Sequence, residues 1–223
     1  FINVRNNQAF PNVCGLNLLL VLDRSGSIGG SESTYKQAAE ALVDSLNGTP
    51  TQIGIISFSA GSANWQGNPD SNFMTSGVNS YQDGSGTASM THSPLDLSVP
   101  GSAATLKTTI GNVYNNPTGG TNWDLALQKA SQAVGFSPNP LTGQTAKPDV
   151  VVFITDGNPT ARSTSGTDAG SEVDLIDLTA GMASANLVKS QTARTGTNLK
   201  IYALGVGSGV TAANLKVASG PTF

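Results

Sequence analysis

The sequence is poor in charged residues, which make up only 11% of its 223 positions, against about 25% in an average soluble protein. Ser, Thr and Asn together occupy 67 positions and Gly another 26, so hydroxyl, amide and backbone groups supply most of the surface polarity. The formal net charge is -3, and Lys and Arg form no cluster along the chain. These features argue against nucleic acid or an anionic membrane as a partner. The composition is typical of an extracellular domain.

Long hydrophobic runs are also absent. The longest, Leu18 to Leu22, has the length of a buried strand, whereas a membrane span needs about 18 apolar residues or more. We therefore expect no membrane insertion by this segment. The N-terminus has no charged region followed by an apolar one, so we expect a signal peptide to have been removed or to lie outside this sequence.

Cysteine and histidine occur once each. Because Cys14 stands alone, an internal disulfide and a site built on paired thiols are excluded. Cys14 is either a small buried residue before a strand or one half of a disulfide with a cysteine beyond Phe223. His92 is the single candidate base for a catalytic triad, and neither Ser25 nor Ser27 has the Gly-x-Ser-x-Gly setting of a nucleophile elbow. We therefore expect no enzymatic activity.

Predicted strands and helices alternate along the chain. Apolar runs predict strands over Asn17–Leu22, Gln52–Phe58, Asp149–Thr155 and Leu199–Val206, of which the first is expected to be buried on both faces and the third to be buried. Apolar residues at helical spacing predict helices over Ser31–Leu46, Ser102–Val113, Asn122–Val134 and about Ser171–Thr192. The alternation predicts an α/β fold with a doubly wound, mainly parallel sheet flanked by helices. Residues 1–223 are expected to form a single domain of this kind.

A long polar insertion interrupts the pattern. Gly, Ser, Asn and Asp dominate Ala60 to Pro100, which is too long for an idle connection. Weak alternation around Ser89 to Val99 predicts an edge strand at its end. Trp65, Phe73 and Tyr81 lie in this insertion, where they form either a small core of its own or aromatic anchors for a partner.

Aspartates and hydroxyl residues stand where buried strands end. Asp23 directly follows the first strand and begins the segment Asp23-Arg24-Ser25-Gly26-Ser27, and Asp156 follows the strand Val150–Thr155. Between them, Gly119-Gly120-Thr121-Asn122 opens a helix. Ligands of such a sheet bind outside the carboxyl ends of its strands, so we expect these oxygens to converge there.

The expected donor set consists of oxygen alone. Two carboxylates and three hydroxyls, without His or Cys, favour Mg²⁺, Mn²⁺ or Ca²⁺ over zinc or copper. With three neutral hydroxyls among the ligands, the protein supplies too few oxygens and too little charge to satisfy a six-coordinate ion, so a position remains for an external ligand. The alternative is that Asp23 and Ser27 cap the first helix and Asp156 ends a strand, which does not explain the recurrence of such oxygens at separate strand ends.

Three segments together resemble the metal-ion-dependent adhesion site of von Willebrand factor A domains, whose order they follow over nearly the whole chain. They are Asp23-x-Ser25-x-Ser27, Thr121, and Thr155-Asp156-Gly157. The resemblance implies that Ser25, Ser27 and Thr121 bind a divalent cation, most simply Mg²⁺, through their hydroxyls. It implies further that Asp23 and Asp156 bind directly or through water, and that an acidic side chain of a protein ligand completes the shell.

Within this family, Cys14-Gly15-Leu16 and the charge-poor surface look like the adhesin domains of Gram-positive surface and pilus-tip proteins. In such domains the upstream cysteine can pair with one in the C-terminal segment, and the chain stops before a final covering helix would be complete. The resemblance implies an extracellular adhesion module, part of a larger protein on the surface or cell wall of a bacterium, with host extracellular matrix as a possible partner. The alternative is an intracellular assembly or chelatase-accessory domain of the same fold.

Partner choice is expected to come from the loops around the cation, with Trp65, Phe73 and Tyr81 as candidate ligand-binding residues. Trp123, next to the Thr121 loop, is interpreted as packing beneath the metal loop. Asp174 and Asp177, with Glu172, are interpreted as favourable charges at a helix N-terminus.

Overall fold

The computed structural model describes most of the chain at the level of side chains. Those residues are 5, 15–59, 94–115, 117, 119–138, 143, 147–162 and 173–220, and backbone strands are described between residues 71 and 92. Within these ranges, the structure contains no helix with the length and apolar character that crossing a membrane requires.

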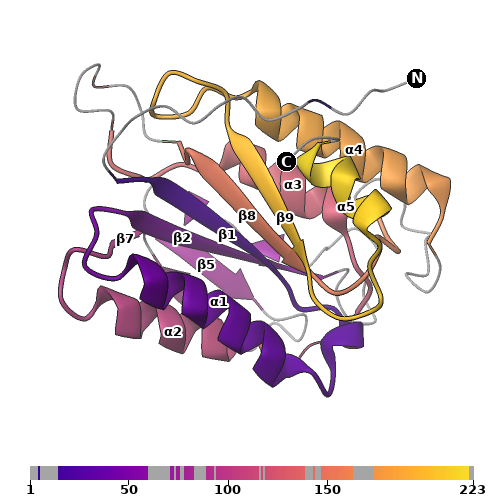
Figure 1. Ribbon diagram of the computed structural model, residues 1–223, viewed down its shortest axis with the longest axis horizontal. Coiled ribbons are helices and arrows are strands. Elements are labelled where there is room, and N and C mark those ends of the chain that lie inside the picture. The colour runs from indigo at the N-terminus through magenta and orange to yellow at the C-terminus, as the bar shows by residue number, and fades with distance from the viewer. Residues whose placement is uncertain are drawn as a thin grey trace.

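Four parallel strands form the centre of the fold (Figure 1). They are β1 (Asn17–Asp23), β2 (Gln52–Phe58), β8 (Val150–Thr155) and β9 (Lys200–Gly205), in the spatial order β2-β1-β8-β9. Strand β1 pairs with β2 on one side and with β8 on the other, both in parallel. Every residue of β1 and β8 is buried, because helices pack on both faces of the sheet and these strands are apolar except at Asn17, Asp23 and Thr155. The predicted doubly wound, mainly parallel sheet is confirmed.

Helices pack on both faces of this sheet. On one face lie α1 (Glu32–Leu46) and α2 (Ser102–Val113), and on the other lie α3 (Trp123–Gln132), α4 (Leu175–Ser190) and α5 (Ala212–Ser219). Alternate residues of β1 enter the two cores: Leu20 and Leu22 face α1 and α2, whereas Leu19 and Val21 face α3 and α4. The period of two in the strands thus divides the apolar residues between two layers.

The predicted helix over Ser171–Thr192 is wrong at its start. Helix α4 begins at Leu175, because Asp174 caps it by accepting a hydrogen bond of 2.8 Å from the backbone N–H of Asp177. No range was predicted for helix α5, which packs against β9: a Cβ on Gly205 would come within 2.8 Å of the Leu215 side chain.

The predicted edge strand over Ser89–Val99 is confirmed only in part, for one short strand at the edge of the main sheet. This stretch is divided between β6 (Ser89–His92) and β7 (Leu95–Asp96). Strand β6 pairs with β5 (Val78–Gln82), which also pairs with β4 (Met74–Thr75), in a second sheet of three strands. Strand β7 and the short β3 (Ser71–Asn72) instead run antiparallel to β2. Weak alternation does not specify register, so tertiary pairing decided it.

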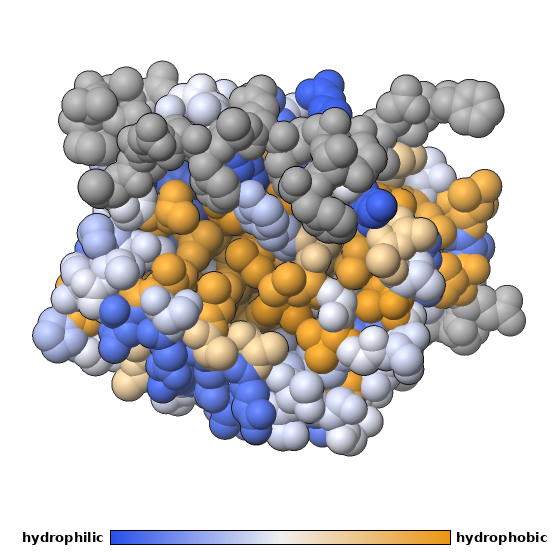
Figure 2. All heavy atoms as spheres, viewed as in Figure 1, coloured by the Kyte–Doolittle hydropathy of each residue, from blue (hydrophilic) through white to orange (hydrophobic). Residues whose placement is uncertain are grey.

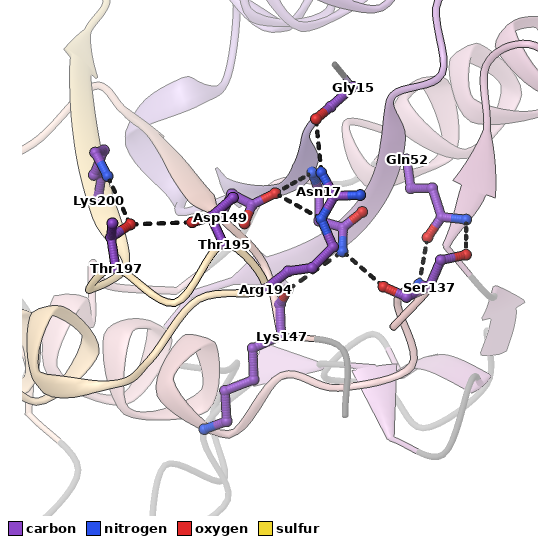
Figure 3. A network of polar contacts seen from close by, with 10 residues as sticks. All are labelled: Gly15, Asn17, Gln52, Ser137, Lys147, Asp149, Arg194, Thr195, Thr197 and Lys200. Atoms are coloured by element: carbon purple, nitrogen blue, oxygen red, sulfur yellow. Dashed lines mark hydrogen bonds and ion pairs between the residues drawn. The ribbon is translucent and has the colours of Figure 1, made fainter. Parts of the chain in front are cut away.

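Polar contacts connect the amino ends of the central strands to one another (Figure 3). Asp149 accepts a hydrogen bond of 2.9 Å from the backbone N–H of Asn17 and lies 3.3 Å from Nε of Arg194. Arg194 also donates to the carbonyl of Gly15 at 2.7 Å. The ion pair balances the charge of Asp149, and the hydrogen bonds hold the starts of β1 and β8 together. The polar groups at this end of the sheet therefore have a structural role.

Part of the sheet is less covered. Figure 2 shows hydrophobic side chains across the face between α1 and α5, over β8 and β9. On β9, Tyr202 is half-buried and Leu204 is 48% exposed.

Candidate metal site

The candidate site lies where the connections of the sheet diverge. From β1 the chain crosses through α1 to β2 on one side, whereas β8 lies on the other side of β1. Asp23 is the last residue of β1 and Asp156 directly follows β8, so both carboxylates stand at the carboxyl edge of adjacent strands. This is the switch point at which open α/β sheets bind their ligands.

Asp23 is fully buried and held on both of its oxygens. Oδ1 accepts a hydrogen bond of 2.8 Å from the backbone N–H of Ser25, and Oδ2 accepts one of 2.6 Å from the Thr155 hydroxyl. These contacts fix the orientation of the carboxylate and turn the chain into the short 3₁₀ helix η1 (Gly26–Ile28).

Asp156 is connected to the first loop through hydroxyls. The Ser27 hydroxyl donates to Oδ1 of Asp156 at 2.9 Å, and it lies 3.1 Å from the hydroxyl of Ser25. Three of the five predicted ligands therefore form one chain of oxygens. Ser25 is buried and Ser27 is exposed, so the chain runs from the interior to the surface.

Thr121 enters the same cluster from a third loop. The backbone N–H of Gly26 donates to the carbonyl of Gly119 at 2.8 Å, which joins this loop to the first one. A Cβ built on Gly157 would lie 3.4 Å from the Thr121 hydroxyl oxygen and 3.8 Å from that of Ser27. Both hydroxyls therefore face the same small space, which Gly157 leaves open because it has no side chain.

Thr160, which sequence reasoning missed, forms hydrogen bonds with both the N–H and the carbonyl of Thr121. The Thr160 hydroxyl accepts a hydrogen bond of 2.9 Å from the N–H of Thr121, and the N–H of Thr160 donates to the carbonyl of Thr121 at 2.9 Å. The N–H of Ala161 donates to that same carbonyl at 3.2 Å. No motif marks Thr160, because the loop returns to Thr121 only in the folded chain.

Arg162 anchors this loop to α4. Its guanidinium lies 2.7 Å from Oδ1 of Asp177, whose side chain is fully buried in the first turn of α4. Asp177 is thus the buried partner of an ion pair, beyond the favourable helix charge that the sequence indicated. The pair fixes the Thr160 loop relative to α4.

Trp123 packs beneath the loops, as predicted. It is fully buried, its ring meets Phe153 edge-on at 5.4 Å between centroids, and its indole N–H lies 3.4 Å from the Thr155 hydroxyl. Since Thr155 in turn donates to Asp23, the indole supports the hydroxyl that orients the carboxylate. A rigid aromatic base therefore stands under the site.

In the metal-free protein, the two carboxyl groups of the site favour the binding of a cation. Burial, followed by repulsion from Asp156, raises the pKa of Asp23 to about 7, although the Thr155 hydrogen bond opposes the shift. Burial also raises the pKa of Asp156. Two carboxylates with raised pKa values at one strand edge are the groups that a divalent cation would stabilise in their charged form.

The donor set fits a hard divalent cation. Adjacent oxygens around an octahedral Mg²⁺ lie about 2.9 Å apart, given bonds of about 2.05 Å. The Ser27–Asp156 and Ser25–Ser27 oxygen separations of 2.9 and 3.1 Å are close to this value. Among the described residues, no three His, Cys, Asp or Glu side chains gather in one place. Hydroxyls would therefore have to provide several of the ligands, and this favours magnesium or manganese over zinc.

A cavity of about 400 Å³ opens next to the cluster. The predicted ligands Ser27, Thr121 and Asp156 line it, together with Thr160 and Val173. Among the described residues that line this cavity, Asp156 is the one charged side chain. The cavity is large enough to admit a side chain of a partner.

The side chains of the predicted ligand-binding aromatics lie outside the described part of the structure. Trp65 and Phe73 fall outside the described residues, and of Tyr81 only the backbone is described, in β5, where it pairs with Met90. These three assignments stay predictions. The insertion does begin near the site, because it follows Phe58, the neighbour of Asp23 in the sheet register.

Fold and cluster together define a doubly wound α/β domain with an all-oxygen candidate cation site at its switch point. The sequence profile of the von Willebrand factor type A domain matches residues 17–223, and the chain belongs to this family. Domains of the family commonly bind divalent cations. No curated protein matches the sequence.

Solved structures share the fold at low sequence identity. The pilus adhesin SpaC from Lactobacillus rhamnosus GG aligns with a TM-score of 0.55 and 16% identity, over 96% of this chain and 28% of SpaC. Proximal thread matrix protein 1 from the mussel byssus aligns with a TM-score of 0.54 and 17% identity, over 92% of this chain and 42% of that protein. The chain spans less than half the length of either protein, and at these identities the likeness establishes the fold alone.

Proposed function

We propose that the chain is a cell-surface adhesion module that binds an acidic side chain of a protein ligand through a divalent cation. The observation that carries the proposal is the oxygen cluster in which Ser25, Ser27 and Asp156 form one chain while Thr121 faces the same space. SpaC, which shares the fold, is a pilus adhesin, and this supports an adhesive role on the surface or cell wall of a bacterium.

Each of the five candidate ligands has a proposed role in holding the cation. Ser25, Ser27 and Thr121 would hold the ion through hydroxyl oxygens, and Asp23 and Asp156 would do so directly or through water. When bound, Mg²⁺, or Mn²⁺ or Ca²⁺ in its place, supplies a positive centre that accepts one further oxygen. The cavity beside Thr121 and Asp156 leaves room for a partner's carboxylate to provide that oxygen.

The proposal is one of binding without catalysis. The hydroxyls of Ser25 and Ser27 contact each other and Asp156, an arrangement suited to holding a cation. Nucleophilic catalysis would instead need a serine activated by an adjacent base that is itself oriented by a third group.

Metal addition tests the site directly. We expect Mg²⁺ at a hundredfold excess over its dissociation constant to stabilise the fold by about 2.7 kcal/mol and to raise the Tm by about 5 to 10 °C. EDTA is expected to leave the protein folded, because neither hydrophobic core contains a candidate metal ligand. Calorimetry in EDTA, Mg²⁺ and Mn²⁺ measures both effects. An unchanged Tm at millimolar metal, with no binding by titration, contradicts the assignment.

Thr160→Val is expected to weaken Mn²⁺ binding by about fivefold, because the buried N–H of Thr121 loses its hydrogen-bond acceptor and the loop loosens. Thr160→Ser keeps that acceptor and is expected to restore affinity. Titration followed by the electron paramagnetic resonance of free Mn²⁺ measures both variants. Equal affinities of the valine and serine variants would show that the Thr160 hydroxyl does not position Thr121.

A further inference from the structure

The first turn of α4 and the residue before its cap expose large apolar side chains. Leu175 is 78% exposed, Ile176 is 58% exposed and Val173 is 43% exposed. Single exposed apolar residues are common, but three of them within four consecutive positions, of which Val173 also lines the cavity at the site, indicate a contact surface. We call Val173, Leu175 and Ile176 the α4 apolar group.

These three side chains do not belong to the face of α4 that packs against the core. The buried stripe of α4 has helical spacing and consists of Asp177, Gly181, Ser184, Ala185, Val188 and Lys189. Gly181 packs against Trp123, since a Cβ there would lie 3.3 Å from the tryptophan side chain. Leu175 and Ile176 precede this stripe and lie outside it, so the core does not use them.

The α4 apolar group borders the candidate metal site. Val173 lines the cavity of about 400 Å³ together with Thr121 and Asp156. The contact between Asp177 and Arg162 fixes the first turn of α4 to the loop that holds Thr121. Figure 2 shows hydrophobic side chains where Figure 1 places the end of α4 that lies toward the carboxyl edge of the sheet.

Charge limits what this surface accepts. Among the described residues, Asp156 is the one charged side chain that lines the cavity, and Asp174 beside the α4 apolar group is 50% exposed but lies 3.8 Å from the guanidinium of Arg162. An acidic partner residue would be repelled here unless it bound the cation. Next to that contact the surface offers apolar area. A complementary segment therefore carries a carboxylate for the ion and a large apolar side chain close to it.

We infer that the α4 apolar group selects the partner, which is a protein segment with an aspartate or glutamate and a Leu, Ile, Met or Phe within about four residues. The inference rests on the proposed function and names the specificity of the same site. It assigns partner selection to α4, in contrast to the insertion from Ala60 to Pro100 that the sequence favoured.

A random peptide library displayed on phage tests the inference without knowledge of the natural ligand. The immobilised protein is selected in Mg²⁺ and in EDTA, as wild type, as the double variant Leu175→Ser/Ile176→Ser, and as the control Leu187→Ser. Leu187 is 42% exposed on the same helix, about 16 Å further along it from Ile176. Mn²⁺ titration of each protein reports that its fold and metal site are intact.

We expect the wild type to enrich acidic peptides with a nearby large apolar residue, in Mg²⁺ alone. The double variant should lose the apolar preference and bind a selected peptide at least about tenfold more weakly, whereas Leu187→Ser should match the wild type. Acidic peptides without an apolar preference, or equal losses in the double variant and the control, overturn this inference and leave the proposed function standing. The absence of any Mg²⁺-dependent acidic motif overturns both.

Discussion

Asp156→Ala is expected to weaken Mn²⁺ binding by more than about a hundredfold and to abolish metal-dependent ligand binding, while the protein stays folded. Asp156 is a candidate metal ligand that directly follows β8 and belongs to neither hydrophobic core. Without metal, the variant should be slightly more stable than the wild type, since repulsion from Asp156 contributes to the raised pKa of Asp23. Ser27, which loses its acceptor, is exposed and can bond to water. Titration with Mn²⁺ and thermal unfolding in EDTA measure the two effects.

Two further variants separate charge from shape in this experiment. Asp156→Asn keeps an acceptor for the Ser27 hydroxyl but removes the charge, and it should also lose most metal affinity. Asp44→Ala removes a surface carboxylate that pairs with Lys107 and should leave metal binding unchanged. Wild-type Mn²⁺ affinity in Asp156→Ala would show that the cation binds elsewhere.

Lowering the pH from about 7.5 to about 5.5 is expected to weaken Mg²⁺ binding by about 25-fold, because one proton must leave Asp23 before the ion binds. The size follows from the pKa of about 7 that burial and Asp156 impose on Asp23 in the metal-free protein. Isothermal titration across this range measures the change. An affinity that does not change with pH would show that Asp23 is already ionised without metal.

The same carboxyl makes the opposite contribution to stability when metal is absent. Since folding raises the pKa of Asp23 from 3.8 to about 7, its contribution is fully present below about pH 4 and is lost as the pH rises through about 7. Unfolding in EDTA should therefore show this contribution declining toward neutral pH. In saturating Mg²⁺ the decline should be smaller, because the ion compensates the buried charge. Asp156→Asn should lower the pH range of the decline, since it removes the repulsion from a charged neighbour.

The sequence indicated which side chains gather at the strand ends, but it did not indicate the residues that support them. Asp23 and Asp156 follow apolar runs, and Ser25 and Ser27 lie within four residues of Asp23, so strand-end position and local spacing identified them. Thr160 and Arg162 carry no comparable signal. Their roles arise from contacts with Thr121 and Asp177, which are 39 and 15 residues away in the chain. Such supporting contacts depend on how a loop packs in the folded chain, and no local sequence pattern predicts this packing.

The insertion shows the same limit. Alternation around Ser89 to Val99 indicated one strand, yet β6 and β7 belong to different sheets. Strand pairing depends on which neighbours are available as well as on the alternation itself. The long apolar strands did not have this ambiguity, because a parallel strand buried on both faces needs a continuous apolar run that few other structures use.

The sequence alone determined the alternation of buried strands and amphipathic helices, the doubly wound sheet that follows from it, and the oxygen-only character of the residues at its carboxyl edge. These are properties of local order and residue chemistry. The tertiary structure alone decided that Gly157 leaves open the space faced by Thr121 and Ser27, and that Thr160 clamps the main chain of Thr121. It also decided that Leu175 and Ile176 remain exposed beside the site. The physical reason is that exposure and long-range hydrogen bonds depend on which surfaces the packed helices leave uncovered, and this is settled only when the whole chain has folded.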